Sequence, residues 1–148
     1  MEDIKKYIDM YQSVDKFGQA NNFQLTVLSP GNVEYLMKVE EKHASSPGIC
    51  HGGAISGLMD ATLGLAALSY TLTVQCLCST VEFKMNFISP AKVGDTLKGI
   101  GKIEHKGKSL VITSADIIDL QTRKLMAKGI GTFNLYPLGK KEFMKDVT

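Results

Sequence analysis

Asp60 is the only charged residue between His51 and Thr80, so one carboxylate stands in a long uncharged stretch. A carboxylate in an apolar helix is unfavourable by several kcal/mol unless it is paired or hydrogen-bonded. No lysine or arginine lies within one helical turn of Asp60. We therefore expect Asp60 to have a functional use. The alternative is a structural carboxylate that faces a polar edge or pairs with a cation.

The segment His51-Gly52-Gly53 is a second candidate, at the point where a polar loop gives way to an apolar helix. Backbone N–H groups in the first turn of a helix have no partner within the helix, and the helix dipole there favours negative charge. Glycine also lets a substrate oxygen approach the backbone. The segment can therefore stabilise an oxyanion, although a glycine-rich helix start without a functional role explains the same residues.

The spacing of the two candidates has a geometric consequence. The helical rise from Gly52 to Asp60 is roughly 12 Å, which is too far for both groups to act on one carbonyl carbon. A second copy of the helix, antiparallel across a twofold axis, would bring Asp60 of one chain near Gly52 of the other. A stripe of small residues on the helix is compatible with a close approach: Gly53, Gly57, Ala61 and Gly64.

The residues before these candidates predict one helix and one hairpin. Apolar side chains at helical spacing indicate an N-terminal helix within residues 1–20, with Asp3 at its start and Gly18 at its end: Ile4, Tyr7, Ile8, Tyr11 and Val14. Alternating apolar and polar residues then predict strands over residues 23–27 and 33–39, joined by a Ser-Pro-Gly-Asn turn. A polar loop is expected over residues 41–50.

The segment from Gly52 to Ser69 predicts a buried helix, because apolar residues occupy nearly all of its directions. Four strands are expected after it, over residues 81–87, 97–104, 110–118 and 125–136, and the short turns between them indicate an antiparallel meander. Phe83, Met85 and Phe87 are expected in the core. The predicted class is α+β: a curved antiparallel sheet of about six strands on one long central helix, plus the N-terminal helix.

Length and composition fit a single domain over residues 1–148, with a frayed tail expected over residues 137–148. The net charge of +2 is too balanced to suggest a nucleic-acid partner. No residues have metal-ligand spacing, the three cysteines are expected as reduced thiols, and His43 and His105 are expected at the surface. Neither a signal peptide nor a good membrane span is evident, so a cytoplasmic location is expected.

Three segments of the chain resemble one known family: residues 51–60, the strand over residues 80–92 and the turn over residues 106–109. The chain resembles the hotdog-fold acyl-CoA thioesterases of the 4-hydroxybenzoyl-CoA thioesterase superfamily, in the subgroup of phenylacetate-pathway thioesterases. The resemblance extends over roughly residues 21–136 and implies the hotdog fold. It also implies hydrolysis of an acyl-CoA thioester to a free acid and coenzyme A.

The resemblance implies a role for each residue near the helix start. The Gly52 N–H would polarise the thioester carbonyl and hold the oxyanion, and Asp60 of the partner subunit would act as general base or nucleophile. Thr80 would help to place the water, and His51 would hydrogen-bond near the thioester or hold the loop. Ser45 stands where family members often carry Asn, and its shorter reach is expected to affect rate or substrate choice.

The resemblance also implies a substrate-binding surface and an assembly. Gly53 and the turn of Lys106, Gly107, Lys108 and Ser109 would bind the acyl-CoA, with the lysines near its phosphates. No cofactor and no metal are implied, because coenzyme A is part of the substrate. The site would be shared in a homodimer, or in a homotetramer built as a dimer of dimers, with no nucleic-acid or membrane partner.

Two other functions on this fold are alternatives. One is a non-catalytic module that binds or senses acyl-CoA, which Ser45 in place of the usual Asn suggests. The other is a dehydratase acting on hydroxyacyl thioesters. It ranks last, because no second catalytic pair of Asp and His is evident on one loop and helix start.

Overall fold

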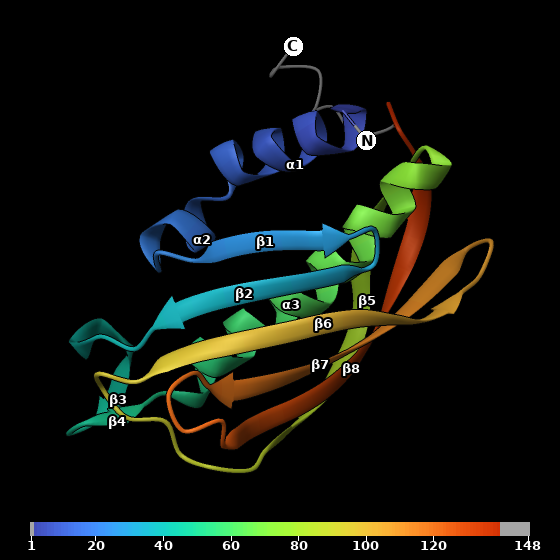
Figure 1. The fold of residues 1–148 in the computed structure, drawn as a ribbon. Coiled ribbons are helices and arrows are strands. Elements are labelled where there is room, and N and C mark those ends of the chain that lie inside the picture. The colour runs from blue at the N-terminus through green and yellow to red at the C-terminus, as the bar shows by residue number, and fades with distance from the viewer. Residues whose placement is uncertain (1, 140–148) are drawn as a thin grey trace.

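The computed structural model describes residues 2–139, in which one curved sheet wraps around one long helix (Figure 1). Six strands form an antiparallel sheet in the order β1-β2-β6-β7-β8-β5, which confirms the predicted α+β architecture. The elements in chain order are α1 (Glu2–Val14), α2 (Lys16–Ala20), β1 (Gln24–Ser29), β2 (Asn32–Lys38), η1 (Glu41–His43), β3 (Ala44–Ser46), β4 (Ile49–Cys50), α3 (Gly52–Thr71), η2 (Leu72–Val74), β5 (Cys76–Phe87), β6 (Thr96–Lys106), β7 (Leu110–Asp119) and β8 (Leu125–Pro137).

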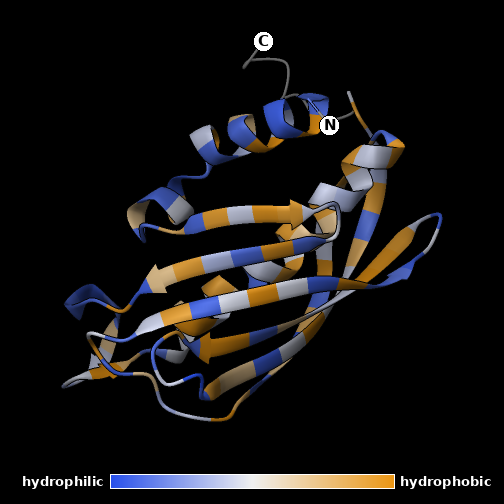
Figure 2. Ribbon diagram, in the orientation of Figure 1, coloured by the Kyte–Doolittle hydropathy of each residue, from blue (hydrophilic) through white to orange (hydrophobic). Residues whose placement is uncertain are grey.

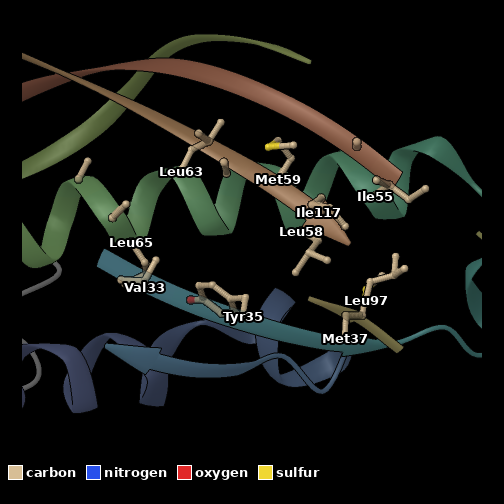
Figure 3. Close-up of a cluster of buried hydrophobic side chains, with 14 of the residues drawn as sticks. Val33, Tyr35, Met37, Ile55, Leu58, Met59, Leu63, Leu65, Leu97 and Ile117 are labelled. Carbon is tan, nitrogen blue, oxygen red and sulfur yellow. The ribbon is translucent and has the colours of Figure 1, made fainter. Parts of the chain in front are cut away.

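The sheet holds α3 closely because the strands opposite the helix carry glycines. A Cβ atom on Gly101 would lie 2.7 Å from the carbonyl oxygen of Thr62, and one on Gly129 would lie 2.6 Å from Sδ of Met59. Both distances are too short for a side chain, so this approach requires glycine. Apolar side chains of α3 and the strands fill the remaining space, as Figure 3 shows: Val33, Tyr35, Met37, Leu58, Leu63 and Ile117.

Hydropathy follows this layering. Hydrophobic and hydrophilic residues alternate along the strands (Figure 2), so one face of the sheet packs on α3 and the other is mixed in character. The stretch Gly52–Val74, which is α3 with η2, is long and apolar enough to cross a membrane by those two criteria alone. However, 61% of its most hydrophobic window is buried inside the fold, as in the core helix of a globular domain.

The predicted four-strand meander is only partly correct. Strands β6, β7 and β8 form it, but β5 pairs with β8 and lies at the edge of the sheet. The connection from β5 to β6 is a long segment containing Pro90 rather than a tight turn. It therefore carries the chain across the sheet, and β1 and β5 are left as the two edge strands.

A bulge in β5 changes which residues face the helix. Thr80 pairs with Phe133 and Glu82 pairs with Thr132, so Val81 is left without a partner. The β5 residues that pair with the helix-facing residues of β8 therefore have even numbers before the bulge, such as Thr80, and odd numbers after it, such as Phe83. Val81 is 58% exposed as a result.

The expected core positions of β5 are also partly corrected. Phe83 and Met85 are half-buried and pack against the core, as predicted. Phe87 is 56% exposed, because it lies at the end of the edge strand beside the start of α3. A Cβ atom on Gly52 would lie 3.4 Å from the Phe87 ring.

Two helices occupy the region where one was predicted. Asp15 separates them, because its Oδ1 accepts a hydrogen bond from the Gly18 N–H at 3.0 Å and so caps α2. Gly18 is thus a buried residue inside α2, not a helix end. Helix α1 lies beside the edge strand β1 (Figure 1), and its Ile8 is buried in the core. Residues 140–148, the main part of the predicted tail, lie outside the described residues.

The expected polar loop before α3 contains the short hairpin β3–β4 and a buried histidine. His43 is only 5% exposed, which contradicts its expected surface position. Its Nδ1 accepts a hydrogen bond from the Glu40 N–H at 2.9 Å, and its Nε2 lies 2.8 Å from Oδ1 of Asn21. His43 therefore joins this loop to the end of α2. His105 is exposed, as predicted, and within residues 2–139 none of the three cysteines forms a disulfide.

Candidate active site

The start of α3 presents one free backbone donor. His51 caps the helix, and its Nδ1 accepts a hydrogen bond from the Gly53 N–H at 2.7 Å. The N–H groups of Ala54 and Ile55 donate to the His51 carbonyl oxygen. Among residues 2–139, the Gly52 N–H has no hydrogen-bond acceptor. Of the predicted donors at this helix start, Gly52 is therefore the one that can receive a substrate oxygen.

The hydrogen bond between the Gly53 N–H and His51 Nδ1 also determines what these two residues can do. Since Nδ1 of His51 is an acceptor, the proton of the neutral imidazole is on Nε2. His51 is an exposed residue. Gly53 uses its N–H on the cap and cannot use the same group on a substrate. The exposed Phe87 ring stands beside Gly52, a neighbour that the sequence pattern had assigned to the core.

Asp60 and Thr80 lie together in the structure. Thr80 Oγ1 donates a hydrogen bond to Asp60 Oδ1 over 3.1 Å. Thr80 faces α3 because it precedes the bulge at Val81 and pairs with the buried Phe133. Asp60 is half-buried and has no cation within salt-bridge distance among residues 2–139. Within residues 2–139, the alternative of an ion-paired Asp60 therefore has no cation to support it.

A hollow of about 140 Å³ opens beside the Asp60 carboxylate. Its other walls come from α1, α3, β5 and β8: Tyr11, Ala61, Gly64, Leu65, Leu68, Cys78, Ser79, Thr80 and Phe133. Tyr11 is a residue that the sequence pattern assigned only to the apolar face of the N-terminal helix. Burial, followed by the nearby carboxylates of Asp15 and Asp60, raises the pKa of Tyr11 to about 12. The Tyr11 hydroxyl is therefore neutral at neutral pH.

The remaining predicted residues lie away from Asp60 within one chain. The turn of Lys106, Gly107, Lys108 and Ser109 connects β6 and β7, and Lys106 Nζ lies 4.7 Å from the centre of the Tyr70 ring. Tyr70 stands near the end of α3, a rise of roughly 27 Å from Gly52. Ser45 is exposed in the β3–β4 hairpin that leads into α3. One chain therefore does not bring the turn and the helix start together.

Two glycines of the predicted stripe of small residues on α3 lie against aromatic side chains of the same chain. A Cβ atom on Gly57 would lie 2.7 Å from the Phe17 ring of α2, and one on Gly64 would lie 3.5 Å from the Phe133 ring. Gly57 and Gly64 thus give room to these aromatic rings, whereas Gly53 of the stripe is exposed. Across residues 2–139, no group of three or more His, Cys, Asp or Glu side chains is placed to hold a metal ion.

Comparison with known proteins places this geometry in a family. The Thioesterase superfamily profile matches residues 47–126, which include α3 and β5. Acyl-coenzyme A thioesterase 13 of Homo sapiens is 33% identical over 124 residues, covering 79% of this chain and 87% of the relative. The solved structure of the E. coli PaaI protein from the phenylacetic acid degradation operon has the same fold, with a TM-score of 0.82, 20% identity, and 90% and 93% of the two chains covered.

A Streptococcus mutans protein solved bound to acetyl CoA is also similar. It is 25% identical, has a TM-score of 0.71, and the match covers 78% of this chain and 90% of that one. The profile match spans more than half of the sequence and includes both the capped start of α3 and the Asp60–Thr80 pair. This chain therefore belongs to the thioesterase superfamily and has the hotdog fold.

Proposed function

We propose that this protein hydrolyses acyl-CoA thioesters to a free acid and coenzyme A. The observation that carries the proposal is the Asp60 carboxylate, which has no paired cation in the described chain, accepts a hydrogen bond from Thr80 at 3.1 Å and borders a hollow. A carboxylate held in this way is suited to act on a bound water. Its relatives support the same chemistry, since one is named an acyl-coenzyme A thioesterase.

The reaction uses two groups at opposite sides of the thioester. Asp60 takes a proton from a water molecule, and the water oxygen attacks the carbonyl carbon. The developing oxyanion accepts the free Gly52 N–H at the positive end of the α3 dipole. The carbonyl then re-forms, the carbon–sulfur bond breaks, and the leaving coenzyme A thiolate takes up the proton that Asp60 removed from the water. A direct attack by Asp60, through an anhydride that water hydrolyses, uses the same two groups.

Two chains are needed for this arrangement in our proposal. The helical rise of roughly 12 Å keeps Gly52 and Asp60 of one chain apart. The edge strand β5 is a suitable contact surface for a second subunit. Three apolar residues on this strand or just after it are at least half exposed: Val81 at 58%, Phe87 at 56% and Ile88 at 50%. We therefore propose a homodimer, alone or within a dimer of dimers, with each site shared between subunits.

The coenzyme A portion is assigned to the β6–β7 turn. Lys106 and Lys108 supply positive charge for phosphates, and the Lys106 ammonium group lies over the Tyr70 ring. The S. mutans protein bound to acetyl CoA supports a coenzyme A ligand for this fold. Since the turn is far from Gly52 within one chain, the acyl-CoA spans the subunit interface. Gly53 contributes to binding by keeping His51 in place.

No cofactor or metal takes part in the proposed reaction, because coenzyme A is part of the substrate. A cytoplasmic location, with no nucleic-acid or membrane partner, belongs to the same proposal. The near-neutral charge balance of 17 basic and 15 acidic residues supports the lack of a nucleic-acid or membrane partner.

The test is release of free thiol from a panel of acyl-CoAs by the wild type, Asp60→Asn and Asp60→Ala. We expect both variants to lose at least about a hundredfold in kcat. Asp116→Asn is the matched control, because Asp116 is an exposed carboxylate paired with Lys128. Equal rates in wild type and Asp60 variants would exclude the catalytic role. Tight acyl-CoA binding with no turnover by the wild type would instead support the non-catalytic binding module that Ser45 suggests.

A further inference from the structure

The hollow beside Asp60 has two lining residues that the family's matched region does not supply, Tyr11 and Phe133. Helix α3 and strands β5 and β8 form most of it, and α1 contributes a single residue, Tyr11. Tyr11 precedes the profile match, which begins at residue 47. A wall from outside the shared core is a place where one member of a family can differ in substrate without any change to its chemistry.

The hollow is polar at one end and apolar at the other. Asp60 and Thr80 form the polar end, where the thioester carbonyl is attacked in our proposal. Gly64 and Leu68 follow Asp60 along α3 by one and two turns, a rise of roughly 6 and 12 Å. An acyl group whose carbonyl lies at Asp60 therefore runs along α3 toward Leu68, in a hollow that Tyr11 and Phe133 also line.

Packing on both sides of Tyr11 holds it in this position. One turn before it, Ile8 is 6% exposed in the core. At the end of α1, the Asp15 N–H donates to the Tyr11 carbonyl oxygen over 3.0 Å. The ring itself is half-buried, and its hydroxyl is uncharged at neutral pH because burial raises the pKa of Tyr11 to about 12. Tyr11 is thus a fixed, neutral wall that an apolar chain can touch.

We infer that Tyr11 is a specificity-determining residue whose ring limits the length of the acyl group that the hollow accepts. This inference rests on the proposed thioesterase function and deepens it. The hollow of about 140 Å³ is similar in size to an engineered protein cavity of roughly 150 Å³ that admits benzene. The preferred substrates are therefore short acyl groups of roughly six carbon atoms, and longer chains meet the Tyr11 ring.

The experiment compares kcat/KM for hexanoyl-CoA and dodecanoyl-CoA in four proteins. Tyr11→Ala removes the wall, so we expect the dodecanoyl-to-hexanoyl ratio to rise at least about tenfold. Tyr11→Phe keeps the ring and is expected to leave the ratio within about twofold of wild type. Tyr7→Ala is the matched control, because Tyr7 lies one turn earlier on α1 and lines a separate hollow near Leu72.

A further variant keeps the test decisive if Tyr11→Ala does not fold. Tyr11→Trp enlarges the wall and is expected to lower the same ratio, in the direction opposite to alanine. An unchanged ratio in a folded Tyr11→Ala, or an equal rise in Tyr7→Ala, would overturn the specificity role. A wild type that hydrolyses neither these nor any other acyl-CoA would overturn the proposed function itself, which is a different result.

Discussion

Thr80 faces Asp60 across the space between β5 and α3, and its hydroxyl donates a 3.1 Å hydrogen bond to the carboxylate. This contact depends on the unpaired Val81 one residue later. In a regular strand, Thr80 would share a face with Glu82 and Lys84 and would point away from the helix. The bulge lets one strand place a hydroxyl at the site and Phe83 in the core.

Replacing Thr80 tests whether this hydrogen bond matters for catalysis. A hydrogen bond to a charged group contributes about 1.5–3 kcal/mol, so Thr80→Val is expected to lower kcat at least about tenfold. Thr80→Ser retains the hydroxyl and should retain most of the rate. Thermal melting of both variants checks that they are folded. A Thr80→Val enzyme with wild-type kcat would show that Thr80 does not act through Asp60.

Local sequence patterns predicted most of the elements because their physical causes are local. The alternation over residues 23–39 and the apolar composition of residues 52–69 correspond to β1, β2 and α3. The place of β5 beside β8 could not be predicted in this way. It depends on the pairing of residues about fifty positions apart, such as Thr80 with Phe133, and neither strand carries a local signal for its neighbour.

Some residues of the candidate site could likewise be predicted from local sequence, and others could not. Asp60 and His51-Gly52-Gly53 stand out in the sequence because a lone carboxylate and paired glycines are costly in a helix. Tyr11 and Phe87 do not stand out, since each follows an ordinary apolar period. Only the packing of α1 and the end of β5 around α3 brings Tyr11 beside Asp60 and Phe87 beside Gly52.

The cap of α3 is expected to contribute both to stability and to the geometry of the free Gly52 N–H. His51→Ala removes the acceptor for the Gly53 N–H and should lower the free energy of unfolding by about 1 kcal/mol. His51→Asn supplies another side-chain acceptor at the cap position and should recover most of this loss. Urea denaturation of the three proteins measures the difference, and equal midpoints would contradict a capping role.

Two glycine-to-alanine substitutions are expected to have opposite effects on stability. Gly101→Ala places a Cβ 2.7 Å from the Thr62 carbonyl oxygen, so overpacking should cost about 1–3 kcal/mol. Gly64→Ala places its Cβ at an ordinary 3.5 Å from the Phe133 ring, and the better helix propensity should stabilise by up to about 1 kcal/mol. Calorimetry compares both with wild type. A stabilising Gly101→Ala would show that α3 can move away from the sheet.

His43 is expected to make stability depend on pH. Burial, and then the nearby Lys42, lower the pKa of His43 below its ordinary value of 6.5. The unfolded chain therefore binds the proton at a higher pH than the folded chain does, and stability rises with pH between the two pKa values. The contribution of neutral His43 is complete above pH 6.5 and is lost as the pH falls through the folded pKa. A proton on Nδ1 also opposes the donating Glu40 N–H.

Removing the titrating group at residue 43 should flatten this dependence. The measurement is the free energy of unfolding of wild type and His43→Gln between about pH 7.5 and about pH 5. We expect His43→Gln to be less stable than wild type at the higher pH, and its stability to fall less on acidification. His105→Gln is the control, because His105 is exposed, and its curve should follow that of wild type. Parallel curves for wild type and His43→Gln would show that another group carries the acid sensitivity, and that the link from His43 to Asn21 survives protonation.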